Sequence, residues 1–128
     1  MATTRNVLVV DDDLDCREFV GAVLEKVGNC SVRTAENGKI ALEMVRDSKP
    51  DLIIMDVMMP EKDGYTTYCE LKGQPDTADI QVIMLSSLVE MGGYMCNSPA
   101  MPQPKLFVEK PIDPGVLADM VTRILSRS

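Results

Sequence analysis

Aspartates follow two apolar segments of this chain at the points where those segments end. Positions 11–13 are all aspartate and come directly after Val7–Val10, and Asp56 comes directly after Leu52–Met55. Short apolar runs of this kind are typical of buried parallel strands, and parallel sheets bind ligands beyond the carboxyl ends of their strands. Carboxylates gathered at one edge repel each other unless a cation lies between them. The pattern therefore predicts a divalent-metal site beside a nucleophilic aspartate, Asp56.

Two further functional groups stand at the ends of later apolar segments. Ser86 follows Gln81–Leu85, and Lys110 follows Leu106–Glu109. Phosphoryl transfer needs an attacking carboxylate oxygen, a hard cation that neutralises oxygens, and hydrogen-bond donors for the other oxygens. Mg²⁺ suits a site with few protein ligands, because it retains waters and phosphate oxygens. These residue types together indicate phosphoryl chemistry.

The composition excludes several classes of function. The chain has no histidine, so histidine acid–base catalysis, histidine metal ligation and a phosphohistidine of its own are ruled out. Its net charge of −7 argues against direct binding to nucleic acid, which usually involves a basic face. The remaining partners are proteins, cations, and phosphate handled through a metal.

Length and hydropathy predict one small domain spanning residues 1–128. No apolar run approaches the roughly 18 residues that cross a bilayer. The first residues lack the apolar core of a secretory signal, so we expect a cytoplasmic protein with no membrane contact. The four cysteines, at positions 16, 30, 69 and 96, are widely scattered, which favours free thiols over disulfides or zinc ligands.

Apolar periodicity predicts strands and helices in alternation. Strands are expected over residues 6–10, 31–34, 52–55, 81–85 and 106–109. Helices are expected over residues 14–27, 38–47 and 64–72, with a last one that starts at Asp113-Pro114. The expected apolar stripe of the first helix is Phe19, Val20, Val23, Leu24 and Val27. Five apolar strands that alternate with helices indicate a parallel sheet covered on both faces.

Four motifs occur in order along the chain. They are Val-Leu-Val-Val-Asp-Asp-Asp at 7–13, Leu-Ile-Ile-Met-Asp-Val-Met-Met-Pro at 52–60 with Asp63-Gly64, Val-Ile-Met-Leu-Ser-Ser at 82–87, and Phe-Val-Glu-Lys-Pro at 107–111. Together they resemble the receiver domain of two-component response regulators. The resemblance runs from about residue 5 to 125. It implies an α/β fold, a doubly wound (βα)₅ flavodoxin-like three-layer sandwich with parallel sheet order 2-1-3-4-5.

The resemblance also implies roles for the acidic residues. Asp56 would accept phosphate from a sensor histidine kinase or a histidine phosphotransfer protein, and become an aspartyl phosphate. Asp11 and Asp12 would hold Mg²⁺ together with Asp56 and the backbone carbonyl of Met58. A phosphoprotein of this kind catalyses only its own phosphorylation and dephosphorylation, so we expect no enzyme for external substrates.

The same resemblance assigns the remaining groups. Ser86 would hydrogen-bond one phosphoryl oxygen, and Lys110 would pair with another. The bond from Lys110 to Pro111 is expected to be cis. Phe107 stands at the family's switch position, where the rotamer follows the movement of the hydroxyl residue, so a new charge would bias a two-state surface.

Other interpretations of these motifs are weaker. Asp11-x-Asp13-x-Asp15 is similar to the start of an EF-hand loop, but Cys16 replaces the needed glycine and Ala22 the closing glutamate. A metal-dependent phosphatase with an aspartyl nucleophile would usually carry a second acid two residues after it, where Met58 stands.

The output surface is the part of the chain that departs most from the family's pattern. The segment 87–105 contains Gly92-Gly93 and three prolines, so we expect an irregular region in place of the family's fourth helix. We expect no output domain after the last helix and therefore expect the output to be contact with a downstream protein, unless the chain is cut from a longer one. The alternatives are a phosphotransfer intermediate or phosphate sink, and a pseudo-receiver scaffold that is never phosphorylated.

Overall fold

The computed structural model describes residues 4–57, 64–86 and 106–126 of the chain. Its strands are β1 (Arg5–Val10), β2 (Cys30–Ala35), β3 (Leu52–Asp56), β4 (Gln81–Ser86) and β5 (Leu106–Glu109). Its helices are α1 (Leu14–Val27), α2 (Gly38–Asp47), α3 (Gly64–Lys72) and α5 (Pro114–Ser126). The predicted elements are all present, with bounds within a residue or two of those expected. The irregular segment predicted over 87–105 lies outside the described residues.

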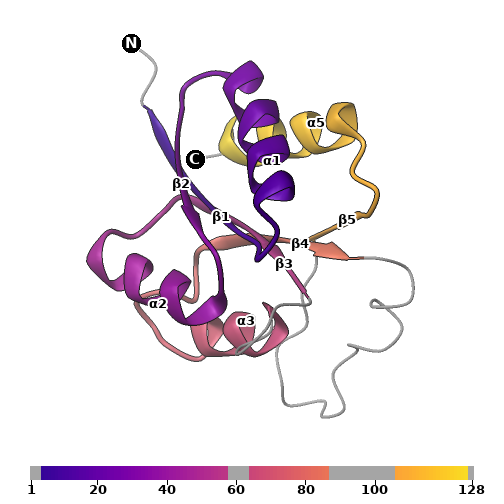
Figure 1. Ribbon diagram of the computed structural model, residues 1–128. Coiled ribbons are helices and arrows are strands. Elements are labelled where there is room, and N and C mark those ends of the chain that lie inside the picture. The colour runs from indigo at the N-terminus through magenta and orange to yellow at the C-terminus, as the bar shows by residue number, and fades with distance from the viewer. Residues whose placement is uncertain (1–3, 58–63, 87–105, 127–128) are drawn as a thin grey trace.

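The strands form one parallel sheet in the order β2-β1-β3-β4-β5. This is the predicted doubly wound order, in which the chain moves outward from β1 first to one side and then to the other. Helices α1 and α5 cover one face of the sheet, and α2 and α3 cover the other (Figure 1). The three-layer α/β sandwich is therefore confirmed.

Alternate residues of each strand supply the two cores. Leu8 and Val10 of β1 pack on the side of α2 and α3, whereas Val7 and Val9 pack on the side of α1 and α5. All four side chains are fully buried, which explains why this strand is apolar without alternation. Fully burying each such side chain stabilises the fold by about 1.5–3 kcal/mol. The central strands are thereby fixed, and so are the residues that end them.

Local signals set the ends of the helices. The Asp13 side chain caps α1 by accepting from the Asp15 amide, and the Asn37 side chain caps α2 by accepting from the Ile40 amide. Asp113 accepts from the amides of Gly115 and Val116 in the first turn of α5. Gly28, with φ of 80°, ends α1 as predicted.

The prediction that Phe19 belongs to the buried stripe of α1 is wrong, because this side chain is 41% exposed. At 3.6 residues per turn, Phe19 lies about 90° from the centre of the stripe formed by Val20, Val23 and Leu24. Val116 is 52% exposed for the same reason, since it precedes the buried Leu117 by one residue in α5. Both residues are apolar, but they lie outside the faces that contact the sheet.

Cys16, Cys30 and Cys69 form no disulfide among the described residues, as expected, and Cys96 lies outside the described part of the chain. No helix in the described ranges is long and apolar enough to cross a membrane.

Candidate functional site

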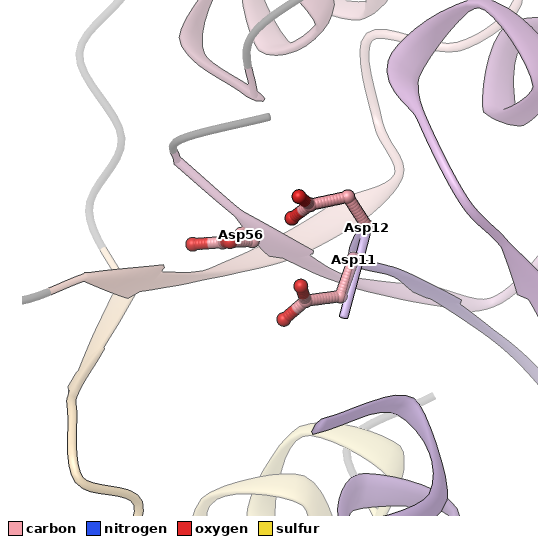
Figure 2. A group of neighbouring side chains, drawn as sticks. All are labelled: Asp11, Asp12 and Asp56. Carbon is pink, nitrogen blue, oxygen red and sulfur yellow. The ribbon is translucent and has the colours of Figure 1, made fainter. Parts of the chain in front are cut away.

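The acidic site forms where β1 and β3 end side by side. Val10 of β1 pairs with Met55 of β3, so Asp11 and Asp56 occupy the next position along each strand. The Asp11 amide continues the sheet by donating to the Ala35 carbonyl at 3.1 Å. One carboxylate oxygen each from Asp11, Asp12 and Asp56 lies within 4.8 Å of the others (Figure 2). The prediction that these three residues meet at one edge of the sheet is confirmed.

The alternation of the strands explains why Asp11 and Asp56 are buried. Asp11 follows the core residue Val9 by two positions, and Asp56 follows Ile54 by two, so both continue the face covered by α1 and α5. Asp11 is fully buried and Asp56 is 4% exposed. Asp12, which follows Asp11 in the connection to α1, is exposed. The site thus has two buried carboxylates and one that faces solvent.

Lys110 supplies the positive charge of this site. Its ammonium lies 3.0 Å from Oδ1 of Asp56 and 3.7 Å from Oδ2 of Asp11. Burial alone would lower the pKa of Lys110, but the hydrogen bond to Asp56 and the charges of Asp56 and Asp11 outweigh it and raise the pKa. The backbone amide of Lys110 donates to the Ser86 carbonyl at 2.9 Å, and the bond to Pro111 is cis, as predicted.

The charges of the site fit a hard cation. Three carboxylates and one ammonium leave a formal charge of −2 (3 negative, 1 positive). Oδ2 of Asp11 is a buried oxygen with no hydrogen-bond partner among the described residues, and buried polar atoms usually have one. A set of carboxylate oxygens is the kind of ligand that Mg²⁺ prefers. The triad is therefore consistent with a Mg²⁺ site.

Ser86 and Phe107 lie on the other face of the sheet. Ser86 is fully buried and follows Leu85, the residue that pairs with Asp56. Phe107 pairs with Met84 and packs against the core on the side of α2 and α3. Since side chains alternate along a strand, Ser86 shares the face of Met84 and Phe107. The hydroxyl and the aromatic ring thus lie on one side of neighbouring strands.

The predicted carbonyl ligand, Met58, lies outside the described residues. So does Ser87, which follows the hydroxyl residue at the end of β4. The predicted site residues within the described part of the chain are Asp11, Asp12, Asp56, Ser86, Phe107 and Lys110.

Cys16 is a member of the site that the sequence did not reveal. Burial and the Asp11 carboxylate, which accepts from the thiol, raise its pKa to about 12. Helical spacing could have located it, since Cys16 stands one turn before the buried Val20 on α1. Its high pKa marks it as an unreactive thiol next to the acidic residues.

Gly64 also has a role that the motif alone did not define. A methyl group on this residue would overlap the carbonyl oxygen of Asp56 and lie 3.0 Å from the Val57 Cα. The Gly64 amide donates to the Val57 carbonyl at 2.8 Å. The start of α3 therefore packs directly on the backbone of Asp56, and only glycine leaves room for that contact.

The chain matches the family model of the response regulator receiver domain over residues 7–122, and it belongs to this family. Among curated relatives, it is 33% identical over 131 residues to the response regulator Rre1 of Synechocystis sp., covering 99% of this chain and 54% of that protein. It is 42% identical over 81 residues to protein PilG of Pseudomonas aeruginosa, covering 63% of this chain and 59% of that protein. The chain spans about half the length of the curated relatives it matches.

Solved structures give the same result. A putative response regulator from Chloroflexus aurantiacus superposes with a TM-score of 0.85 at 30% identity, covering 97% of this chain and 99% of that one. The signal receiver domain of a histidine kinase from Syntrophus aciditrophicus gives 0.83 at 36% identity, with coverage of 95% and 90%. Receiver domains are partners of histidine kinases in two-component signalling and are typically not enzymes in their own right.

Proposed function

We propose that this chain is a phosphorylation-dependent receiver whose phosphoacceptor is Asp56. The observation that carries the proposal is the position of the Asp56 carboxylate, which is almost fully buried at the end of β3 and lies 3.0 Å from the Lys110 ammonium. Oxygens of Asp11 and Asp12 lie within 4.8 Å of it. Closely spaced charges that include a group with a shifted pKa, here Lys110, are common at functional sites.

The phosphoryl group must come from outside the chain, because the chain contains no histidine. A carboxylate oxygen of Asp56 attacks the phosphorus of a phosphohistidine on a sensor kinase or a histidine phosphotransfer protein. The P–N bond breaks, its electron pair stays on the partner's imidazole, and an acyl phosphate forms on Asp56. The partner's imidazole regains a proton from water.

Two side chains of this protein hold the transferred group. Lys110 is already paired with Asp56, and we propose that its ammonium moves to one of the new phosphoryl oxygens. The Ser86 hydroxyl donates to another, which draws it toward the carboxyl edge of the sheet. Asp56, Ser86 and Lys110 are thus the residues that contact the reacting atoms.

Asp11, Asp12, Asp56 and the Met58 carbonyl would bind Mg²⁺. When bound, Mg²⁺ neutralises charge on these carboxylates and on the phosphoryl oxygens, which would otherwise repel the incoming phosphate. The proposal for Asp11 and Asp12 is supported by the net negative charge of the site and by Oδ2 of Asp11, a buried carboxylate oxygen.

The readout is a change in a protein-binding surface. A shift of Ser86 toward phosphate would open space on the face that it shares with Phe107, and the ring would follow. The common face of these residues and the pairing of Phe107 with Met84 support this role. The partner that reads the change is a downstream protein, and neither nucleic acid nor membrane is required.

Intact mass spectrometry tests the phosphoacceptor. Wild type and Asp56→Asn are incubated with Mg²⁺ and acetyl phosphate, a small phosphodonor that replaces the kinase. Only the wild type should gain the mass of one phosphate. Gain by both proteins, or by neither, would refute the assignment. Asp47→Asn, a change at the exposed end of α2, is the control and should gain phosphate like the wild type.

A second measurement separates a switch from a relay. Affinity capture with the phosphorylated and unphosphorylated wild type should recover different downstream proteins if the chain is a switch. Recovery of histidine phosphotransfer proteins alone, in both states, would favour a phosphotransfer intermediate or sink.

A further inference from the structure

Arg17, at the end of the first turn of α1, reaches back to the end of β1. Its guanidinium Nη1 donates to the Asp11 carbonyl at 2.7 Å, and its own backbone amide donates to the Asp13 carbonyl at 3.0 Å. These two carbonyls belong to the residues on either side of Asp12. One residue therefore holds the backbone on both sides of Asp12.

The position of the Asp12 carboxylate depends on the local backbone more than the positions of the Asp11 and Asp56 carboxylates do. Asp56 is part of β3, and Asp11 is held by its amide on Ala35 and by its carboxylate, which accepts the Asp13 amide at 2.9 Å. Asp12 is exposed, so no packing around its side chain fixes where the carboxylate lies. The direction in which this side chain leaves the chain is set by the planes of the adjoining peptide groups.

The hydrogen bond from Arg17 acts on one of those planes directly. The Asp11 carbonyl belongs to the rigid peptide group that joins Asp11 to Asp12, so fixing its oxygen also fixes the direction of the Asp12 amide and the position of its Cα. Bonds from a charged donor are stronger than neutral ones, and this one is partly shielded from water. Without it, the peptide group could rotate and carry the Asp12 carboxylate away from Asp11 and Asp56.

We propose that Arg17 is a positioning residue for the divalent-cation site, holding the Asp12 carboxylate in place so that Mg²⁺ binds more tightly. The proposal rests on the metal site of the proposed function. It assigns to Arg17 no contact with Mg²⁺, with phosphate or with the reacting atoms.

The charge of Arg17 works in the opposite direction, which makes the proposal testable by sign. A positive charge near three carboxylates disfavours a second cation, so removing that charge alone would strengthen Mg²⁺ binding. Removing the hydrogen bond would weaken it, because residues that orient metal ligands typically contribute about 10–100-fold to metal affinity. The two accounts therefore predict opposite changes.

The chain offers a matched control for this test. Arg33 of β2 also donates its guanidinium to a backbone carbonyl, that of Ser48, at 2.6 Å. Ser48 follows the end of α2 and precedes β3, whereas the acidic triad lies where β1 and β3 end. Arg33→Met and Arg17→Met each remove one positive charge and one hydrogen bond to a carbonyl, and both keep a long apolar side chain.

Calorimetric Mg²⁺ binding to the full chain, with circular dichroism to check folding, tests the inference. Arg17→Met should bind Mg²⁺ about tenfold more weakly than the wild type, and Arg33→Met should bind it equally well. Equal or tighter binding by Arg17→Met would overturn the role of Arg17. If Arg17→Met does not fold, Arg17→Gln replaces it, with the same expected loss, since its side chain is too short to reach the Asp11 carbonyl.

Two further outcomes separate this inference from the proposed function. If the wild type itself binds no Mg²⁺, the metal site fails and the role of Arg17 fails with it. If the wild type binds Mg²⁺, phosphorylation of Arg17→Met by acetyl phosphate should be slow at low Mg²⁺ and return to the wild-type rate at saturating Mg²⁺. A deficit that persists at saturation would contradict a role exercised through the metal site.

Discussion

Strand β3 has an aspartate at each end, and the two aspartates have different environments. Asp51, just before the strand, is exposed; its carboxylate accepts the Asn6 amide at 2.8 Å, and its own amide donates to the Asn6 carbonyl at 2.7 Å. Asp56, at the other end, is 4% exposed and lies among Asp11, Asp12 and Lys110. The same residue type thus joins two strands at the amino edge and forms a charged site at the carboxyl edge.

The role of a carboxylate in a parallel sheet therefore depends on which edge of the sheet it occupies. At the amino edge the strand ends are tied by backbone pairs, and ionic contacts such as Lys49 with Asp79 are exposed. At the carboxyl edge the strands of a parallel sheet end together beneath the connections to the helices, so acidic groups are brought together and partly shielded from water. Charge at that edge is costly unless a cation balances it.

Among the changes that would test this difference between the edges, we expect the largest effect from a substitution of Gly64, which packs on Asp56. Gly64→Ala would place a methyl group onto the Asp56 carbonyl and force α3 or the end of β3 to move. We expect a loss of about 3 kcal/mol in the free energy of unfolding. Gly73→Ala, at the other end of α3, brings its methyl group only to 3.2 Å from the Cys69 carbonyl and should cost less than about 1 kcal/mol. Urea unfolding followed by circular dichroism measures both, and equal losses would contradict the close contact at Asp56.

Ion pairs at the two edges give the next largest effect. Lys110→Ala removes the ammonium from between two buried carboxylates and should destabilise the fold by about 2 kcal/mol in the absence of Mg²⁺. Lys49→Ala removes a shorter pair, 2.8 Å from Asp79, but an exposed one, and should cause no measurable change.

Added Mg²⁺ should affect the two lysine variants differently. The added cation should recover part of the stability lost in Lys110→Ala and leave Lys49→Ala unaffected. Thermal unfolding with and without Mg²⁺ measures the difference. A Lys110→Ala protein as stable as the wild type without metal would mean that the charges at the carboxyl edge are not coupled.

Removing the exposed carboxylate should weaken metal binding without unfolding the chain. Asp12→Ala should reduce Mg²⁺ affinity at least about tenfold, because even residues that only orient ligands contribute that much. Asp79→Ala removes the same charge at the amino edge and should leave affinity unchanged. Calorimetry provides the numbers. Unchanged affinity in Asp12→Ala would remove this residue from the metal site.

The last expected difference between the two edges is in how stability depends on pH. Burial, and then the Asp11 carboxylate, raise the pKa of Cys16 from 9.0 to about 12, while burial alone raises the pKa of Cys30 at the start of β2. The unfolded thiol ionises near 9.0 and the folded one does not, so stability is full below pH 9 and falls as pH rises toward 12.

Variants of the two cysteines test this pH dependence. Between pH 9 and 11, Cys16→Ala should lose less stability than the wild type does. Cys30→Ala should also lose less, but its difference from the wild type should be smaller. Unfolding midpoints measured across that range in metal-free buffer test the ranking. A larger benefit in Cys30→Ala would contradict the influence of Asp11 on Cys16.

The sequence is sufficient to predict those site residues that directly end or follow a strand. Asp11 and Asp56 end apolar strands, and in a parallel sheet of order 2-1-3-4-5 those strands are neighbours, so the meeting of the carboxylates follows from topology. Lys110 directly follows β5, so its position at this edge of the sheet is predicted in the same way. The two-sided burial of Val7–Val10 also follows from composition, since only a strand covered on both faces is apolar throughout.

Contacts made by the helices were not predictable in the same way. Whether Arg17 reaches the Asp11 carbonyl, or Gly64 packs on Asp56, depends on how each helix leaves the sheet, and no residue pattern encodes that path. Phe19 shows the same limit, because an apolar residue at the margin of a stripe is buried or exposed according to a rotation of the helix by a few tens of degrees. Residues 58–63 and 87–105 lie outside the comparison.

The position of the phosphate on the chain shows whether Asp56 is the phosphoacceptor. After treatment with Mg²⁺ and acetyl phosphate, borohydride reduces an aspartyl phosphate to homoserine, and peptide mass spectrometry then identifies which aspartate was converted. We predict homoserine at position 56 and unmodified aspartate at positions 51, 11 and 12. Homoserine at any of those three positions, with Asp56 unchanged, would show that Asp56 is not the phosphoacceptor.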